Sequence, residues 1–422
     1  MKVCTVGLGY IGLPTAAMLA SRGHEVIGLD VNQSVVDAVN AGQAHFQEPD
    51  LQMLLSAAVD TKRLRATTTP EPAEFFLIAV PTPMVNEGPD MAFVEAAART
   101  IAPVLEKGNV VILESTSPVG STELLGEIFA EERPDLTFPR YRDEDNVADV
   151  ALCHCPERIL PGQMLRELVS NDRIIGGMTM DCAQKAAKLY QSFVMGTCYV
   201  TDSRVAELCK LSENAYRDVN IAFANELSII CDKLGTDIWQ VRELANQHPR
   251  VNILMPGAGV GGHCIAVDPW FIVSSAPEEA RLIRTARIVN DDKPHRVVAQ
   301  VSALADKFKV PTIACYGITY KPDVDDVRES PALEIVEEIA GLEGSQVLVV
   351  EPNLSELPAS LAGRANVRLV NSDEARETAD IVTFLVGHRQ FKRLEGDSYL
   401  SKAVVDTTGM FSTRKAKAVE RD

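Results

Sequence analysis

The sequence predicts an α/β protein in which two parallel-sheet domains are joined by a central helical domain with one long helix. Two observations carry this prediction. Apolar, strand-like runs alternate with helical stretches near both ends of the chain, and the region between them has helical periodicity. Alternation of strands and helices is typical of a parallel sheet covered by helices. A chain of 422 residues is also long for one hydrophobic core.

The first domain is expected over residues 1–185, where apolar runs recur: "KVCTVG", "EVIGLD", "FFLIAV", "VVILEST" and "VALCHCP". The last run contains the one cysteine and histidine cluster, Cys153–Cys155. In an extended strand the two cysteines share one face and the histidine points to the other. This cluster is therefore a poor metal site, and we expect no bound metal.

The central domain is expected over residues 186–295 and is dominated by one helix from about Ser203 to Leu234, a stretch without glycine or proline. About thirty helical residues span roughly 45 Å, more than one subunit's core requires. Apolar residues lie on more than one side of its later half: Ile221, Phe223, Leu227, Ile229 and Ile230. Such a surplus is best buried against a partner, so we expect a homodimer.

Strand-like runs return in residues 296–422, as "TIACYGITY", "QVLVVEP", "DIVTFLVG" and "AVVDTTG". They predict a second, smaller α/β domain.

Charge and composition exclude several classes of partner. The 59 acidic residues outnumber the 41 basic ones, for a net charge of −18, which disfavours a nucleic acid. The sequence contains no run of 18 apolar residues, so we expect no membrane span. Met1 leads directly into a predicted strand rather than into a signal peptide. We therefore expect a cytoplasmic protein. The nine scattered cysteines are expected to be reduced thiols.

A dinucleotide motif follows the first predicted strand. Gly7, Gly9 and Gly12 form a GxGxxG pattern that opens a helix, with Tyr10 and Ile11 between the last two. The glycines permit a tight turn, close approach of the pyrophosphate, and packing of helix on strand. The motif predicts a Rossmann-like domain, with all five residues at the cofactor.

Cofactor choice depends on Asp30, which ends the second predicted strand. A carboxylate there accepts from the ribose 2′-hydroxyl and repels a 2′-phosphate, which favours NAD over NADP. The alternative is a glycine turn followed by a surface aspartate. Thr82 and Thr116 lie in loops after later strands and are candidate contacts to the nicotinamide half. The alternative is that they are ordinary turn and cap residues.

The glycine-rich stretch "GAGVGGHCIAVDP" allows three interpretations of Cys264: a small buried hydrophobe, a metal ligand shared with His263, or a nucleophile.

On the long helix, Lys210, Asn214 and Arg217 fall on one stripe, at i, i+4 and i+7. This stripe is either a solvated polar face or a face that meets a ligand.

Together these motifs resemble the UDP-glucose/GDP-mannose dehydrogenase family over essentially the whole chain. The segments "CPERILPG", "GVGGHCIAVDPW" and "YKPDVDDVRESPA" are most similar to the branch that oxidises UDP-N-acetyl-D-mannosamine. The resemblance implies a four-electron oxidation of the sugar C6 hydroxyl to a carboxylate with NAD, in polysaccharide biosynthesis. It also implies that the third domain binds the UDP-sugar. Alternatives are UDP-GlcNAc, UDP-GalNAc or UDP-glucose as substrate, a two-electron hydroxyacid-type dehydrogenase, or a non-catalytic NAD-binding protein.

The resemblance also implies roles for five residues. Cys264 would form a thiohemiacetal and then a thioester with the substrate. Lys210 would stabilise the developing alkoxide and share proton transfer with Asp268. Glu157 would assist hydrolysis of the thioester, and Asn214 would lie at the oxyanion.

Eleven positions match the substrate contacts of that branch: Arg158, Ile159, Lys210, Asn214, Arg217, His248, Arg250, Gly261, Tyr320, Lys321 and Arg328. The arginine that the branch often carries soon after the last strand has only Arg414 as a counterpart here.

Overall fold

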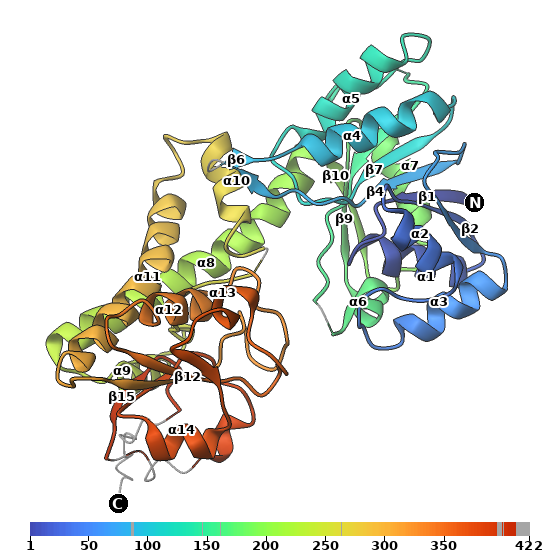
Figure 1. Cartoon of the computed structure of the whole chain (residues 1–422). Coiled ribbons are helices and arrows are strands. Elements are labelled where there is room, and N and C mark those ends of the chain that lie inside the picture. The colour runs from blue at the N-terminus through green and yellow to red at the C-terminus, as the bar shows by residue number, and fades with distance from the viewer. Residues whose placement is uncertain are drawn as a thin grey trace, which may run out of the picture. The chain divides into compact units, whose positions relative to one another are not determined.

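The computed structural model describes residues 1–85, 88–145, 147–160, 162–262, 264–394, 399 and 401–410. It divides into two compact units (Figure 1). The first consists of Met1–Glu213 and Trp270–Pro277, and the second of Asn214–Pro269 and Glu278–Asp422. Among the described residues, no helix has the length and apolar character that a membrane span requires.

The first unit is built on an eight-stranded sheet in the order β10-β9-β8-β7-β4-β1-β2-β3. Its strands are β1 (Lys2–Val6), β2 (Glu25–Leu29), β3 (Leu64–Thr67), β4 (Phe75–Ile78), β7 (Val110–Leu113), β8 (Ala151–His154), β9 (Arg173–Gly177) and β10 (Cys198–Asp202). All neighbouring strands are parallel except β8 and β9. A short antiparallel pair, β5 (Met84–Val85) and β6 (Gly88–Pro89), lies outside this sheet.

Helices cover both faces of this sheet, as a doubly wound α/β fold requires. They are α1 (Gly12–Ser21), α2 (Gln33–Asn40), α3 (Leu51–Asp60), α4 (Ala92–Ile101), α5 (Ser121–Glu132), α6 (Met164–Ser170) and α7 (Met180–Tyr190), with a 3-10 turn at Ala102–Val104. One apolar cluster joins the sheet to α1, α3 and α7. A second cluster joins the opposite face to α4 and α5.

The strands β3, β9 and β10 were not predicted, and the sheet continues to Asp202, beyond residue 185. Glycines in β9 let neighbouring backbone approach closely. A Cβ on Gly176 would lie 2.5 Å from the carbonyl oxygen of Asp202, and one on Gly177 would lie 2.4 Å from the amide nitrogen of Ala183. These two positions therefore admit only glycine, although glycine is unfavourable in a strand.

The second unit contains a five-stranded, wholly parallel sheet in the order β13-β12-β11-β14-β15. Its strands are β11 (Thr312–Tyr316), β12 (Gln346–Val350), β13 (Val367–Leu369), β14 (Ile381–Phe384) and β15 (Ala403–Asp406). Its helices are α9 (Ile238–Ala245), α11 (Arg281–Ala305), α12 (Pro331–Ile339), α13 (Ala359–Ala362) and α14 (Ser372–Thr378), with a 3-10 turn at Phe391–Arg393. Helices α11 and α12 pack on one face, and α14 packs on the other.

The long helix predicted from about Ser203 to Leu234 is confirmed as α8, which has these bounds. In the second unit α8 packs on α11 through buried polar contacts. Arg287 of α11 forms an ion pair of 2.6 Å with Asp218 of α8, and both side chains are inaccessible to solvent. Asn225 of α8 also donates to the side-chain oxygen of Asn290 at 2.9 Å. The predicted fold class is confirmed; the antiparallel β8–β9 pair is an addition to it.

Candidate active site

The glycine turn between β1 and α1 has the conformation that a dinucleotide site needs. Gly7 has a φ of +89°, and a Cβ there would lie 2.6 Å from the carbonyl oxygen of Ala79. A Cβ on Gly12 would lie 1.8 Å from the carbonyl oxygen of Gly7, so α1 can begin this close to the turn only with glycine. A Cβ on Gly9 would meet nothing within 4 Å. That exposed position leaves room for a pyrophosphate, so the residues present fit NAD.

Asp30 lies directly after β2 and its carboxylate holds the glycine turn. Oδ2 accepts from the amide of Leu8 at 2.8 Å, and Oδ1 accepts from the amide of Asn32 at 2.9 Å. The negative charge therefore lies beside the turn, where a ribose would follow the pyrophosphate. Tyr10 is partly exposed, and its ring packs on Phe46 with the centroids 4.4 Å apart. Ile11 is half-buried and precedes α1.

The structure brings the two predicted threonine loops together at the carboxyl ends of β4 and β7. The hydroxyl of Thr82 donates to the carbonyl of Thr116 at 2.7 Å. The hydroxyl of Ser115 donates to the carbonyl of Val80 at 2.7 Å and accepts from its amide at 2.9 Å. The carboxyl edge of a doubly wound sheet is where ligands bind, so these paired loops lie on the correct edge for a cofactor.

Glu157 follows β8 and is nearly buried, with 7% of its surface exposed. Its Oε2 accepts from the guanidinium of Arg173 at 2.7 Å, and its Oε1 accepts from the amide of Arg158 at 2.6 Å. The side chain of Arg158 forms an ion pair of 2.6 Å with Glu213 of α8. Ile159 is half-buried in the same segment. The fully buried guanidinium of Arg173 holds the carboxylate of Glu157 in place.

Two further buried groups were not among the predicted site residues: Arg173 and a second carboxyl group, Glu114, which follows β7. Oε1 of Glu114 accepts from the hydroxyl of Tyr190 at 2.7 Å, and Oε2 has no partner among the described residues. Burial raises the pKa of Glu114 from 4.5 to about 7, and the negative charge of Glu157 adds to this shift. The sequence contains a signal for both residues, because "VVILE" and "RIIGG" each place one charged residue next to an apolar run. Such a residue is buried only when it is paired.

The predicted stripe of α8 is not an evenly solvated face. Lys210 is half-buried, Asn214 is buried and Arg217 is exposed. The amide of Asn214 donates to Oδ2 of Asp268 at 2.5 Å, and Asp268 is itself buried at the start of α10 (Asp268–Ser275). Two of the predicted catalytic residues are therefore in direct contact.

Cys264 lies one turn before α10, and the amide of Asp268 donates to its carbonyl at 2.8 Å. All nine cysteines lie within the described residues, and Cys264 is the only exposed one. This exposure contradicts the interpretation as a small buried hydrophobe. His263, the other half of the metal interpretation, lies outside the described residues.

The glycine-rich loop before Cys264 is held at both ends. At its start, the amide of Gly257 donates to the side-chain oxygen of Asn225 at 2.9 Å. Near its end, a Cβ on Gly261 would lie 2.2 Å from the carbonyl oxygen of Glu329, and one on Gly262 would lie 3.0 Å from the ring of Tyr320. The glycines are therefore needed for close packing against the segment from Tyr320 to Pro331.

That segment carries three of the predicted substrate residues, so the structure brings them to the Cys264 loop within one unit. Lys321 places its ammonium 5.3 Å from the centroid of the Tyr320 ring. Arg328 forms an ion pair of 2.7 Å with Asp326. By contrast, His248 and Arg250 are exposed in the loop after α9, and their hydrogen bonds within the described residues do not reach the Cys264 loop. Arg414 lies outside the described residues.

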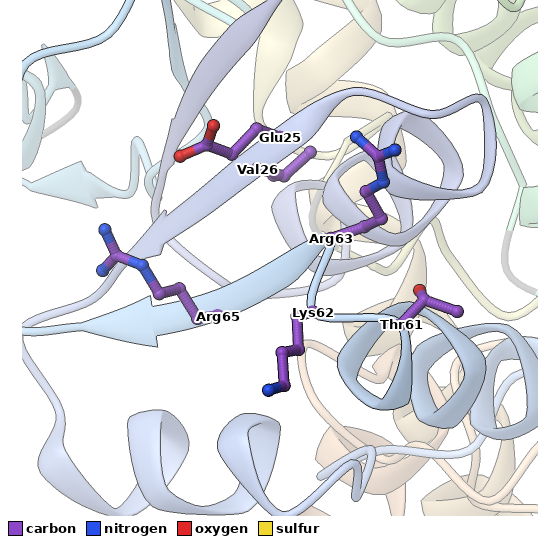
Figure 2. Close-up of a pocket in the computed structure, with 6 residues that line it drawn as sticks. All are labelled: Glu25, Val26, Thr61, Lys62, Arg63 and Arg65. Atoms are coloured by element: carbon purple, nitrogen blue, oxygen red, sulfur yellow. The ribbon is translucent and has the colours of Figure 1, made fainter.

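A surface cavity of the first unit is not this site. It is lined by Glu25, Val26, Thr61, Lys62, Arg63 and Arg65 (Figure 2). These residues lie at the amino ends of β2 and β3, opposite the edge that carries the glycine turn. Figure 2 shows the three basic side chains pointing in different directions, and Arg65 is paired with Glu71. They do not converge on a ligand.

Comparisons with known proteins show the family of the chain. Three domain models of the UDP-glucose/GDP-mannose dehydrogenase family match the chain: the NAD binding domain over residues 1–194, the central domain over 204–292 and the UDP binding domain over 314–414.

Two relatives and two solved structures illustrate the similarity. The chain is 58% identical to an NDP-N-acetyl-D-galactosaminuronic acid dehydrogenase of Ralstonia nicotianae, covering 99% of this chain and 97% of that protein. It is 56% identical to the UDP-N-acetyl-D-mannosamine dehydrogenase of Escherichia coli K12, covering 97% and 99%. A UDP-D-ManNAc dehydrogenase structure from Pyrococcus horikoshii is similar with a TM-score of 0.85 at 36% identity, covering 97% and 96%. The UDP-N-acetyl-mannosamine dehydrogenase of Staphylococcus aureus gives 0.83 at 39%, covering 98% and 96%.

Proposed function

We propose that the substrate is a UDP-N-acetylhexosamine, since the chain belongs to the UDP-glucose/GDP-mannose dehydrogenase family and is an NAD-dependent UDP-sugar dehydrogenase. The best candidate is UDP-N-acetyl-D-mannosamine, oxidised at C6 to UDP-N-acetyl-D-mannosaminuronate. The observation that carries the four-electron chemistry is the exposed thiol of Cys264 on a tightly packed glycine loop, one turn from Asp268. A two-electron dehydrogenase needs no such thiol.

The overall reaction converts a primary alcohol and one water into a carboxylate, with two hydrides and three protons removed. NAD, when bound, accepts one hydride in each of the two oxidations. Gly7, Gly9, Gly12 and Asp30 would hold it. An aldehyde has no second hydride to give until a nucleophile makes its carbon tetrahedral. Cys264 fills this role by forming a thiohemiacetal, and loss of the second hydride leaves a thioester.

Lys210, Asn214 and Asp268 act on the oxygen that develops negative charge. Lys210 supplies the positive charge that stabilises the alkoxide, and Asp268 shares the proton transfer through water. Asn214 supports both functions, because its amide donates to Asp268 and has a second N–H for the substrate oxygen. The half-buried position of Lys210 supports this role, because a partly desolvated ammonium interacts more strongly with an oxyanion.

Glu157 assists the hydrolysis of the thioester. The oxygen of the attacking water becomes part of the carboxylate, its protons leave, and the Cys264 thiolate is released. The contact with Arg173 supports this role, because it holds the carboxylate of Glu157 in one position.

The identity of the sugar rests on the relatives. The segments "CPERILPG" and "YKPDVDDVRESPA" resemble the branch that oxidises UDP-N-acetyl-D-mannosamine. A second candidate is the UDP-N-acetyl-D-galactosamine series, because the relative from Ralstonia nicotianae is named for N-acetyl-D-galactosaminuronic acid and is 58% identical. Both candidates carry an N-acetyl group.

A panel of UDP-sugars decides between them. The purified chain is assayed for NADH formation with UDP-ManNAc, UDP-GlcNAc, UDP-GalNAc and UDP-glucose, each with NAD and with NADP. We expect the highest kcat/KM for UDP-ManNAc with NAD. Highest activity with UDP-GalNAc would support the second candidate, and highest activity with UDP-glucose would contradict the proposal.

We further propose that the protein is a cytoplasmic homodimer formed along the later half of α8. Phe223 is 58% exposed and Ile230 is 43% exposed, and they lie seven residues apart on one side of this helix. Ile221, Leu227 and Ile229 are half-buried beside them. Contiguous exposed apolar side chains on a helix are typical of a protein interface.

A further inference from the structure

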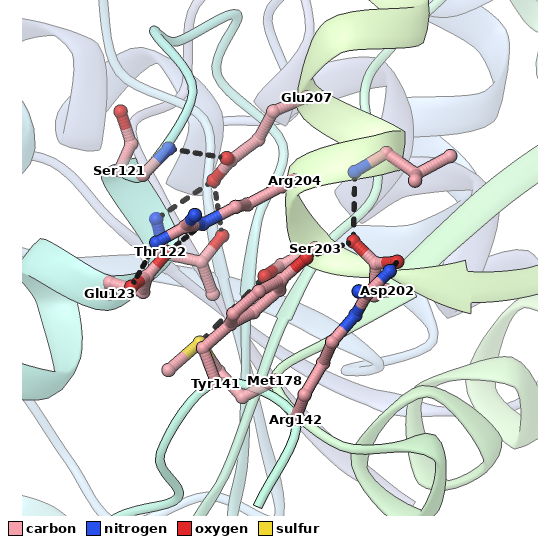
Figure 3. Close-up of polar contacts among 12 residues, drawn as sticks. Ser121, Thr122, Glu123, Tyr141, Arg142, Met178, Asp202, Ser203, Arg204 and Glu207 are labelled. Carbon is pink, nitrogen blue, oxygen red and sulfur yellow. Dashed lines mark hydrogen bonds and ion pairs between the residues drawn. The ribbon is translucent and has the colours of Figure 1, made fainter.

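Glu207 lies on α8 one turn before Lys210 and is completely buried, with 0% of its surface exposed. Its Oε2 accepts from the amide of Gly120 at 2.7 Å. Its Oε1 accepts from the amide of Thr122 at 2.9 Å and from the hydroxyl of Thr122 at 2.6 Å. Figure 3 shows the carboxylate of Glu207 directed from α8 toward the start of α5. All three donors come from one segment at the beginning of α5.

These contacts supply a helix cap from a distant part of the chain. The residue before α5 is Gly120, with a φ of +98°, and no side chain of the segment itself caps the helix. The first amides of a helix need acceptors, and a negative charge is favourable at this end. Burial raises the pKa of Glu207, and the hydrogen bonds from Thr122 and Gly120 oppose that shift. A buried carboxylate held in this way is costly to disturb.

The capped segment is the end of the loop that carries Thr116. This loop leaves β7 at Leu113, accepts the hydroxyl of Thr82 at Thr116, and enters α5 at Ser121. Glu207 therefore contacts the loop's far end, while Lys210 follows on the next turn of the same helix. The two groups cannot move independently without breaking a buried hydrogen bond.

We propose that Glu207 is a positioning residue that holds the loop from Thr116 to Gly120 in register with Lys210. Thr116 of this loop is the predicted contact to the nicotinamide half of the cofactor, and Lys210 is proposed to act at the substrate oxygen, so Glu207 would set the geometry of hydride transfer. This inference rests on the proposed function for the role of Lys210, but its main test does not require turnover.

A second contact between the start of α8 and α5 is partly exposed and provides a matched control. Arg204 pairs with Glu123 of α5 at 2.6 Å, and the two side chains are 49% and 26% exposed. Exposed pairs of this kind contribute about 1 kcal/mol or less. Glu123→Gln therefore loosens the same α8–α5 junction without changing the loop.

The substitution that tests the proposal is Glu207→Gln, which preserves size but not the pattern of acceptors. An amide group has one acceptor oxygen, so its NH2 must face the amide of Gly120 or that of Thr122, and one hydrogen bond is lost. The binding of NADH and of ADP-ribose is measured by calorimetry for the wild type, Glu207→Gln and Glu123→Gln. We expect the Kd for NADH to rise about tenfold in Glu207→Gln, consistent with one lost charge-assisted hydrogen bond. The Kd for ADP-ribose should stay within about twofold, because that ligand lacks the nicotinamide half.

An unchanged affinity of Glu207→Gln for NADH would overturn the proposal. An equal loss of affinity for NADH and for ADP-ribose would also overturn it, because that result indicates a merely structural role. Glu123→Gln should leave both constants unchanged. If Glu207→Gln does not fold, Thr122→Val removes the hydroxyl contact alone, and a smaller loss confined to NADH is expected. If no UDP-sugar supports NADH formation, the proposed substrate is wrong, while this binding comparison still decides the role of Glu207.

A kinetic readout tests the link to Lys210. With the best sugar deuterated at C6, the isotope effect on kcat should be larger for Glu207→Gln than for the wild type, because misplacement slows hydride transfer itself. A lower kcat with an unchanged isotope effect would show only a smaller fraction of active enzyme, and would contradict the link.

Discussion

The side-chain amide of Asn214 donates to Oδ2 of Asp268 at 2.5 Å, and both residues are buried. This hydrogen bond joins α8 to the first residue of α10. The amide of Asp268 in turn donates to the carbonyl of Cys264, and Asn225 of α8 accepts from Gly257 at the other end of the loop. The long helix therefore fixes both ends of the segment that presents the thiol.

Replacing Asn214 by leucine should reduce catalysis without unfolding the protein. Asn214→Leu leaves the buried carboxylate of Asp268 without this donor and removes the N–H that we propose for the oxyanion. We expect kcat to fall at least about 100-fold, as for removal of an oxyanion donor in other enzymes. The Kd for NADH should not change. Asn220→Ala, on the same helix, is the control and should be near wild type. A kcat of Asn214→Leu within about twofold of the wild type would contradict the assigned role.

The negative charge of Asp30 should determine the cofactor preference. Asp30→Asn retains an oxygen that can accept from Leu8 and removes the charge that repels a 2′-phosphate. We expect kcat/KM for NAD to fall and the ratio of NAD to NADP efficiency to drop at least about tenfold. Steady-state kinetics with both cofactors measure this ratio, with the exposed Asp37→Asn as control. A wild-type enzyme that prefers NADP would refute this interpretation of Asp30.

The buried carboxyl group of Glu114 should make stability depend on pH. Its pKa is raised from 4.5 to about 7 in the folded chain, so the native state binds a proton that the unfolded state has lost in this window. The free energy of unfolding therefore falls as pH rises from about 4.5 to 7, by about 1.4 kcal/mol per pKa unit at most.

Glu114→Gln preserves an acceptor for Tyr190 and removes this titration. We expect the variant to gain stability relative to the wild type as pH rises, and to be the more stable of the two at pH 8. Urea denaturation at pH 5 and pH 8 measures the difference. Glu127→Gln, at an exposed position of α5, should show none. If the difference in the free energy of unfolding between wild type and variant does not change with pH, Glu114 does not titrate in this range.

The exposed apolar side chains of α8 should support self-association. Phe223→Glu introduces a charge at the centre of the proposed interface and should give a monomer at micromolar concentration. Ile229→Glu should act in the same direction. Met53 of α3 is 70% exposed, so Met53→Glu is a matched control that should leave the dimer intact. Sedimentation velocity measures the masses, and a fully active wild-type monomer would refute the proposed dimer.

Much of the fold follows from local pattern. The strands β1, β2, β4, β7 and β8 are mainly apolar, and the bounds of α8 follow from the absence of glycine and proline. The strands β3, β9, β10 and β13 escaped prediction because each is short or interrupted by charged residues or glycine. In β9, Arg173 and two glycines serve tertiary contacts, with Glu157 and with the starts of α7 and α8, that no local pattern records.

The candidate site, like the fold, could be predicted from the sequence only in part. The sequence motifs predicted the glycine turn, Asp30 and the segment around Cys264, because each depends on residues near one another in the chain. The contacts of Glu157 with Arg173 and of Glu207 with Thr122 join residues far apart, and they depend on the order of strands in the sheet. The composition of a single strand or helix does not indicate which distant residue it will contact. The partners of both carboxylates are therefore known only from the structure.

The number of NADH formed per UDP-sugar consumed tests the central claim of a four-electron oxidation through Cys264 most directly. A limiting amount of the best UDP-sugar is converted to completion with excess NAD, NADH is measured by absorbance, and the product is identified by mass spectrometry. We predict two NADH and a carboxylate product for the wild type. Cys264→Ser should remain folded and bind NADH but fail to complete the oxidation. A wild-type ratio of one, or a serine variant that forms the uronate at a normal rate, would contradict the account.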